Sequence, residues 1–311
     1  MAGPSVPAER FDHFMARANA AYYARGRFGQ DFTTAPEITQ VFGELLGAWA
    51  KIVWQMLGAP EDIILAEAGP GRGVLMADAL RAWPAPHVHL IETSPALRTE
   101  QATRVPQAQW HASLASIPDA PLILIANEFL DALPVRQFIR RTSGWMERYV
   151  ENGAYLELPA DYPLPDDPVG SIREVNEAAL RFCEELAARN AIGLFIDYGP
   201  AESAAGESVQ AIRGGTYADP LSEPGETDIT AHVDFGAIKR SVHAQGPVKQ
   251  NYFLTALGLY QRSDALAQRH PEKAMDLRLC VQRLTAPEAM GSLFKVLAVC
   301  PDHLPPLPGF A

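Results

Sequence analysis

The sequence is short of cysteine, of basic residues and of long apolar runs. Its 311 residues include three cysteines, Cys183, Cys280 and Cys300, which are widely spaced and form no Cys-x-x-Cys pair. This usage argues against a disulfide framework or a zinc site and suits a reducing compartment. The 26 Lys and Arg residues are outnumbered by 37 Asp and Glu, which gives a formal net charge of −11. Nucleic acid is therefore not expected as the main partner, because it is bound through cationic surfaces.

No apolar run is long enough to span a bilayer, and residues 1–5 lack the apolar core of a signal peptide. We therefore expect a cytoplasmic protein without a membrane partner. His87 and His89 alternate along one expected strand without further ligands nearby, so no metal site is expected. The remaining composition is ordinary for a folded protein, with 48% apolar and 20% charged residues.

A glycine-rich turn organises the first half of the chain. Residues 63–67 form an apolar run that ends in an acid, and three alternating glycines separate it from a helical pattern over residues 74–83. This order predicts a strand, a tight turn and a helix, because glycine permits positive φ and lets a ligand approach the backbone. A dinucleotide-binding turn has a glycine where this chain has Val74, so the pattern favours S-adenosylmethionine (SAM) over NAD. The predicted cofactor contacts in this turn are Glu67, Gly69, Pro70, Gly71 and Gly73.

Further cofactor contacts are expected after the next two strands. Residues 88–92 form a second strand that ends at Glu92, about 20 residues beyond the glycines, where a carboxylate binds ribose hydroxyls in such folds. Thr93 follows it, and a helix is expected to begin at Ser94. Residues 109–111 form a short third strand, and the loop after it places Ser113 near the adenine in this architecture.

The catalytic residues are expected beyond the central strand. Residues 122–126 are wholly apolar, as in a buried parallel strand, and are followed by Asn127, Glu128 and Asp131. Ligands in open α/β sheets bind outside the carboxyl ends of strands. Glu128 and Asp131 are therefore the catalytic candidates. The alternative is that these carboxylates cap the next helix or bind the loop backbone.

The rest of the chain predicts helices and insertions around this core. Residues 11–23 form a short helix, and Thr34 caps a second helix that extends to Met56. We expect residues 1–60 to be a helical segment packed on a domain of residues 61–311. That domain would contain a β-hairpin insertion at about 135–170, a helix over 174–189 and a helical insertion at about 251–290. A fifth strand ends at Asp197 and Tyr198, and a last strand covers 292–300.

Two loops and one histidine complete the predicted site. The glycine-punctuated loop 25–36 and the long polar loop 201–228 are expected to close over the ligands. Thr230 is expected to cap a helix with His232 in its first turn, where the helix dipole would lower the imidazole pKa. His232 is the third catalytic candidate, although a purely capping role is an open alternative.

These motifs resemble the MidA family of class I SAM-dependent methyltransferases, which includes the mitochondrial complex I assembly factor 7 type. The resemblance implies an α/β fold with a doubly wound, seven-stranded Rossmann-like sheet, SAM as the cofactor and N-methylation of a protein arginine. It places Phe32, Thr33, Pro36, Asp197 and Tyr198 on the acceptor side and Asn127 with the cofactor. The matching stretches are residues 34–38, 42–45, 67–73, 92–95, 127–134, 197–199, 228–235 and 290–295.

Three positions depart from the family pattern: Gln30, Gly215 and Asn251. All lie outside the expected cofactor core, so they leave SAM intact and bear on the acceptor. A diverged small-molecule N- or O-methyltransferase and a SAM-binding assembly factor without turnover are therefore alternative functions. An NAD(P) oxidoreductase is disfavoured by Val74 and by the absence of a catalytic Tyr-x-x-x-Lys motif.

Overall fold

The computed structural model describes residues 7–25 and 34–311. Gln30, Phe32 and Thr33 lie outside the described residues, as does most of the expected lid segment 25–36. Among the described residues, no helix has both the length and the apolar character needed to cross a membrane.

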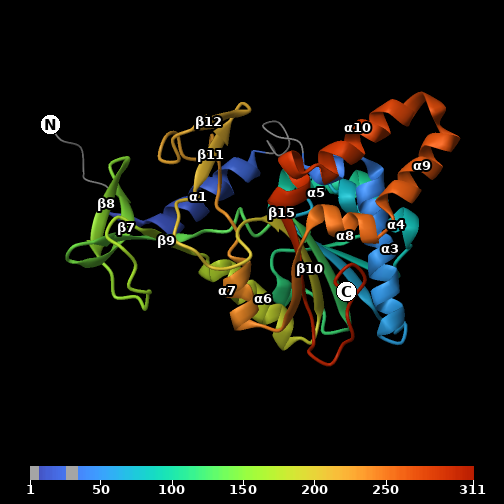
Figure 1. Cartoon of the computed structure of the whole chain (residues 1–311), viewed down its shortest axis with the longest axis horizontal. Coiled ribbons are helices and arrows are strands. Elements are labelled where there is room, and N and C mark those ends of the chain that lie inside the picture. Colours follow the sequence, from blue (N-terminus) through green and yellow to red (C-terminus); the bar gives the residue numbers. More distant parts are fainter. Residues whose placement is uncertain (1–6, 26–33) are drawn as a thin grey trace.

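A seven-stranded sheet forms the centre of the molecule, in the order β14-β15-β10-β5-β2-β3-β4 (Figure 1). Neighbouring strands are parallel except where β15 pairs antiparallel with β10 and β14. The predicted doubly wound sheet is confirmed. Its strand order reverses between β2 and β5, the point at which such sheets bind ligands. The strands are β2 (Ile64–Ala68), β3 (His87–Ile91), β4 (Gln109–His111), β5 (Leu122–Asn127), β10 (Ile192–Tyr198), β14 (Ala244–Lys249) and β15 (Phe294–Val299).

Helices cover both faces of this sheet. On one face lie α3 (Gln40–Met56) and α4 (Val74–Ala82), and on the other lie α6 (Glu177–Ala188) and α7 (Phe235–Ser241) (Figure 1). Gly47 allows α3 to approach α4 closely, because a Cβ atom there would lie 2.1 Å from the Ala79 carbonyl oxygen. Strands β2 and β5 are buried along their whole length, which explains their continuous apolar sequence. Helix α5 (Pro95–Arg104) follows β3, and a 3₁₀ turn (Leu114–Ser116) follows β4.

The N-terminal segment differs from the prediction at Thr39. The first helix, α1 (Phe11–Ala24), forms as expected, but the helix expected from Thr34 to Met56 is divided into α2 (Ala35–Ile38) and α3. Thr39 is extended between them, and its hydroxyl accepts a hydrogen bond from the Val41 N–H at 3.3 Å. A threonine that caps the second helix thus interrupts the first. Thr34 occupies the predicted N-cap position, although of the short α2, and its side chain makes no cap hydrogen bond.

The expected hairpin insertion is part of a larger, five-stranded antiparallel sheet, seen at the left of Figure 1. The order is β1-β7-β6-β9, and β8 pairs with β7. The sequence-based interpretation missed β9, whose last two residues fall in the helix predicted over 174–189; α6 begins at Glu177 after the cap residue Asn176. The strands are β1 (Glu9–Arg10), β6 (Arg136–Arg141), β7 (Gly144–Glu151), β8 (Ala154–Pro159) and β9 (Ile172–Val175).

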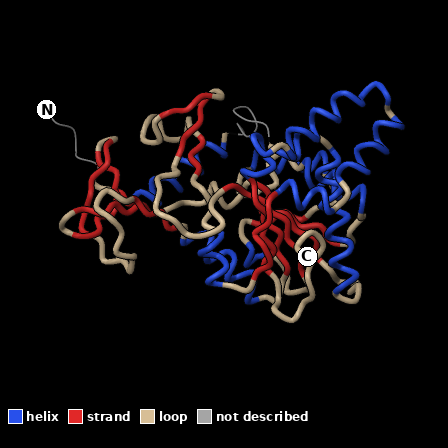
Figure 2. Tube along the Cα trace, viewed as in Figure 1, coloured by secondary structure: helices blue, strands red, loops and turns tan. Residues whose placement is uncertain are grey.

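The segment 201–228 is not a structureless loop. It contains β11 (Gln210–Arg213) and β12 (Thr216–Ala218), which form a three-stranded sheet with β13 (Asp228–Thr230), coloured as strands in Figure 2. Thr230 belongs to β13, and Asp234 caps α7 through the Ala237 N–H. The prediction that Thr230 caps a helix with His232 in its first turn was therefore wrong.

The helical stretch after β14 is broken rather than continuous. It comprises α8 (Gln250–Ala256), α9 (Leu259–Arg269), a 3₁₀ turn (Pro271–Lys273), α10 (Ala274–Thr285) and a π-helical turn (Pro287–Gly291). Gly258, with φ of 88°, separates α8 from α9, and α9 packs against α3. Helices α9 and α10 form the arm at the upper right of Figure 1.

Candidate active site

The glycine turn has the geometry that the sequence predicts. Gly69, Gly71 and Gly73 have φ values of 65°, 49° and 78°, in the left-handed region where side chains are disfavoured. A Cβ atom at Gly69 would also lie 2.9 Å from the Phe129 ring. Gly73 is the N-cap residue of α4, so the turn delivers the backbone directly to a helix N-terminus.

A cavity of about 420 Å³ adjoins this turn at the carboxyl ends of β2, β3 and β5. Its walls include five of the predicted cofactor residues, which come from three separate loops. Glu128 also lines it. The five are Gly69, Gly71, Glu92, Thr93 and Ser113.

Helix α1 closes this cavity, which the sequence-based interpretation missed. Ala16, Asn19, Ala20 and Tyr23 of α1 line it. Asn19 is 4% exposed and donates hydrogen bonds to the carbonyls of two distant segments, residues 132 and 229. The available signal was a polar residue on the buried stripe of an amphipathic helix.

Gln101 is a second residue that sequence reasoning missed. Its side-chain nitrogen donates to the Gly71 carbonyl at 2.7 Å and to the Glu92 carboxylate at 3.2 Å. Its oxygen accepts from the Trp110 indole at 2.8 Å. One fully buried amide therefore fixes the glycine turn relative to Glu92. Burial raises the pKa of Glu92, whose carboxylate also accepts from the Ser94 N–H at 2.7 Å.

A smaller cavity of about 20 Å³ lies on the other side of the turn. Glu67, Pro70, Asn127 and Pro36 line it, whereas Gly73 lines neither cavity. The Glu67 Oε2 and Asn127 Oδ1 atoms are buried and have no hydrogen-bond partner within the described residues. Burial raises the pKa of Glu67 to about 8. Two unsatisfied acceptors on residues that line one small space are suited to a ligand that carries a hydrogen-bond donor.

A third cavity, of about 400 Å³, holds the predicted catalytic residues. Glu128, Asp131, His232 and Tyr198 line it together with the exposed side chain of Tyr217 from the β11–β12 hairpin. Burial raises the pKa of Glu128 to about 7, and that of Asp131 to about 7, with the neighbouring Glu128 contributing to the latter. No ion pair to either carboxyl is formed within residues 7–25 and 34–311. Asp228 and Arg283 also line this cavity, so its acids outnumber its cations.

Glu128 has an unusual backbone. Its φ is 51°, its N–H donates to the Ile196 carbonyl at 2.9 Å, and its carboxylate accepts from the Asn127 amide at 2.9 Å. A glutamate whose backbone lies in the left-handed region carries about 1–3 kcal/mol of conformational strain, and residues strained in this way cluster at functional sites. The backbone turn aims the carboxyl where both large cavities meet, since Tyr23 and Glu128 line both.

Asp197 does not line these cavities. Its carboxylate is 1% exposed and accepts from the N–H groups of Leu130 at 3.0 Å, Asp131 at 3.3 Å and Tyr198 at 2.9 Å. Asp197 therefore holds the loop that carries Asp131, and its carboxylate makes these backbone contacts rather than lining the acceptor cavity. Burial, with the nearby Asp131 carboxyl, raises its pKa strongly.

His232 lies before α7, not in it. Its backbone N–H donates to the Ser208 hydroxyl at 2.8 Å, and its ring meets Tyr198 edge to face with centroids 5.5 Å apart. Its pKa is lowered, as expected, but the cause is partial burial of the ring rather than a helix dipole. No cluster of three or more His, Cys, Asp or Glu side chains with metal-site geometry occurs in the described part of the chain.

Comparisons with known proteins agree with this architecture. The family model of S-adenosyl-L-methionine-dependent methyltransferases matches residues 45–253. The chain is 31% identical to the protein arginine methyltransferase NDUFAF7 homolog of Drosophila melanogaster, over 97% of this chain and 83% of that protein. It is 30% identical to human NDUFAF7, over 97% and 81%. A Burkholderia thailandensis crystal structure bound to S-adenosyl-homocysteine superposes with a TM-score of 0.87 at 25% identity, over 98% and 90%.

These relatives correct one expectation and confirm another. The Drosophila and human proteins are named mitochondrial, which contradicts the cytoplasmic location expected from the sequence. The resemblance to the MidA family, with SAM as cofactor, is confirmed. With the glycine turn, the strand order and a full-length match in agreement, the chain belongs to this family of SAM-dependent methyltransferases.

Proposed function

We propose that this enzyme methylates a nitrogen of an arginine side chain in a protein. The observation that carries the proposal is the pair of carboxyls, Glu128 and Asp131, which line one cavity beside the cofactor cavity and whose pKa values burial raises to about 7. A guanidinium is the protein side chain that best satisfies two carboxylates, because its planar donors match carboxylate geometry. The names of the Drosophila and human relatives, which are protein arginine methyltransferases, support the same acceptor.

The cofactor residues fit SAM. We assign the unsatisfied acceptors of Glu67 and Asn127 to its amino group and the Glu92 carboxylate to its ribose hydroxyls. The N–H groups of the glycine turn would face the carboxylate of its amino-acid part. When bound, SAM supplies an electrophilic methyl group.

The acceptor residues address the poor nucleophilicity of a guanidinium. Its pKa exceeds about 12, so it enters the pocket protonated and with a delocalised lone pair. Carboxylates at Glu128 and Asp131 would hold two of its nitrogens, localise positive charge there and orient the third nitrogen toward the cofactor cavity. Tyr198 lines the same cavity beside Asp131, and its hydroxyl donates a hydrogen bond to the Thr230 hydroxyl at 3.0 Å. The proton released after transfer would pass to one of these carboxylates or to His232.

The test measures S-adenosylhomocysteine formation with arginine peptides, with the methylated atom located by mass spectrometry. Glu128→Gln and Asp131→Asn keep the side-chain shape and remove charge. We expect turnover to fall by about 10²-fold or more while SAM affinity stays within a few-fold. Glu184→Gln, at an exposed position on α6, is the matched control and is expected to behave as the wild type.

Three outcomes would contradict the proposal. Methylation of lysine peptides or of small amines in preference to arginine peptides would replace the acceptor. Near-normal turnover in both acidic variants would remove Glu128 and Asp131 from the catalytic role. SAM binding without S-adenosylhomocysteine formation, across peptides and metabolites, would instead favour an assembly factor.

A further inference from the structure

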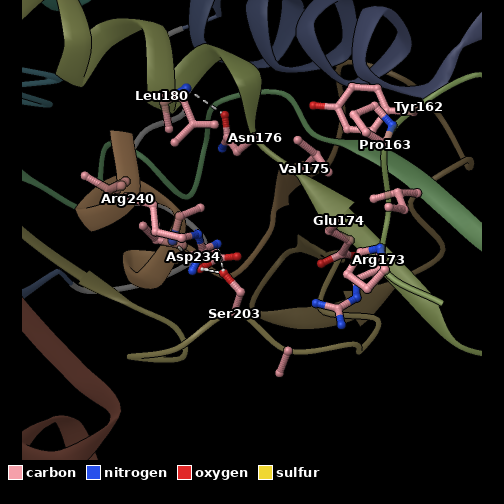
Figure 3. Close-up of a pocket in the computed structure, with 17 residues that line it drawn as sticks. Tyr162, Pro163, Arg173, Glu174, Val175, Asn176, Leu180, Ser203, Asp234 and Arg240 are labelled. Carbon is pink, nitrogen blue, oxygen red and sulfur yellow. Dashed lines mark hydrogen bonds between the residues drawn. The ribbon is translucent and has the colours of Figure 1, made fainter. Parts of the chain in front are cut away.

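The acceptor cavity continues into two more cavities along the surface. His232 and Leu293 line both the acceptor cavity and a neighbouring cavity of about 440 Å³. Glu174 and Asp234 line that neighbour and also a further cavity of about 440 Å³, drawn in Figure 3. We call the last two cavities the outer groove. Because adjoining cavities share lining residues, the outer groove extends the acceptor site well beyond the space that one side chain fills.

The acids of the outer groove are already engaged. Glu174 accepts hydrogen bonds from a glutamine side chain, a serine hydroxyl and two backbone N–H groups. Asp234 accepts from the Ser203 hydroxyl at 2.7 Å and from a backbone N–H of α7 at 2.8 Å, and Glu207 pairs with Arg148. These carboxylates therefore serve the fold and have little capacity left for a cationic ligand.

Two cations of the outer groove have no acidic partner. Arg173 is paired with Asp167 at 2.6 Å, but the described residues provide no ion pair for Arg240 or Lys295. Arg240 is exposed and donates to the Ser203 hydroxyl, and Figure 3 shows these two side chains together with Asp234. The Lys295 ammonium donates to a backbone carbonyl at 3.3 Å. The outer groove thus contains two cations that form no ion pair with a described residue, whereas acids outnumber cations in the acceptor cavity.

We propose that the outer groove binds the polypeptide that carries the target arginine and that Arg240, at the far end of the groove, binds an Asp or Glu side chain of that polypeptide, while Lys295, in the cavity nearer the acceptor, adds positive charge along the same path. The inference rests on the proposed arginine methylation and adds a specificity rule to it. Charge of opposite sign at the two ends of one continuous site selects an arginine followed or preceded, at a fixed spacing, by an acid. Leu293, half exposed between the two ends, offers apolar contact to the connecting residues.

The experiment compares otherwise neutral peptides that contain one arginine and a single Glu, moved one position at a time to either side, with matched Gln peptides. We expect one spacing at which Glu lowers KM by about fivefold relative to Gln, the upper range for one partly exposed ion pair, with kcat unchanged. The preference should shrink as salt is added.

Charge-reversal variants test whether Arg240 and Lys295 are the cations that cause the preference for Glu. Arg240→Glu and Lys295→Glu are each expected to reduce the preference for Glu, and Arg240→Glu should improve a peptide with Lys at that spacing. Lys239→Glu makes the same charge change at an exposed neighbour that lines neither cavity of the outer groove, and it should keep the wild-type preference.

Each outcome has a distinct meaning. If wild-type enzyme methylates arginine peptides but Glu and Gln are equivalent at every spacing, the outer groove does not read an acid and the inference is wrong. Equal loss of preference in Lys239→Glu and Arg240→Glu would also reject it, since only overall charge would then matter. If no arginine peptide is methylated, the proposed function fails and this inference fails with it.

Discussion

Binding of an arginine peptide should tighten as pH rises from 6 to 8. The pKa values of Glu128 and Asp131 are raised by burial to about 7, from ordinary values of 4.5 and 3.8. At pH 6 about one-tenth of such a carboxyl is ionised, and at pH 8 about nine-tenths. Because a guanidinium binds the ionised form, each carboxylate it requires contributes about a tenfold increase in affinity over this range.

The two carboxyls will not act independently. Ionisation of one raises the pKa of the other, so the total increase should lie between about tenfold and about a hundredfold. Calorimetry with saturating S-adenosylhomocysteine prevents turnover and measures the affinity directly. Below pH 7, peptide binding should also release protons, which appears as a dependence of the binding enthalpy on the buffer.

In the absence of peptide, the contribution of these two carboxyls to the free energy of unfolding should decrease, not increase, as pH rises. Both folded-state pKa values lie above the unfolded ones, so the folded protein retains protons that the unfolded chain loses as pH rises from about 4 to about 7. These two groups therefore reduce stability over that interval, and Glu128→Gln with Asp131→Asn should lessen the decline. An affinity that is flat or falls between pH 6 and 8 would refute the reasoning, because the carboxyls would then not be the groups that bind the cation.

Three further predictions concern the cofactor side and the core. Glu67→Gln should weaken S-adenosylhomocysteine binding by about tenfold in calorimetry without lowering Tm, because it removes a charge-assisted hydrogen bond and a buried acid together; unchanged affinity would place the amino group elsewhere. Gln101→Ala should destabilise the fold by about 2 kcal/mol in urea unfolding, since it leaves buried partners unsatisfied; a wild-type midpoint would contradict this. Gly47→Ala should cost about 3 kcal/mol, because its Cβ would meet the Ala79 backbone, whereas Gly206→Ala, with open space around it, should be neutral.

The sequence predicts the parts of the site that local pattern determines. The glycine turn and the carboxylates after the central strand each follow an apolar run typical of a buried parallel strand, and Glu92 follows a strand of mixed apolar and histidine residues. The parallel sheet then brings these strand ends to one edge. For that reason the cavities are lined by Gly69, Glu92 and Glu128, although no two of these are near in sequence.

The errors arise where distant pairing decides the structure. β11 pairs with β13 across 15 or more residues, and β9 pairs with β6 although β7, β8 and a proline-rich loop lie between them in the chain, so neither segment has a local signature. Thr39 was read as helical because its neighbours continue the apolar stripe, yet its hydroxyl stabilises a cap instead. Backbone partners supplied by other elements, not side-chain periodicity, determine these three regions.

Helix α1 shows how a segment without a recognisable motif becomes part of the site. Asn19 bonds to the carbonyls of Ala132, in the loop after Asp131, and Ile229, in β13. The backbone carbonyl of Tyr23 accepts a hydrogen bond from the Ser94 hydroxyl at 3.0 Å. The Tyr23 hydroxyl donates a hydrogen bond to the carboxylate of Asp228 in β13 at 2.7 Å. Helix α1 is thus hydrogen-bonded to three parts of the site: the loop after β3, the loop after β5, and strand β13. Since Tyr23 lines both large cavities, α1 can couple occupancy of the cofactor cavity to the shape of the acceptor cavity, a role that amphipathic periodicity alone does not reveal.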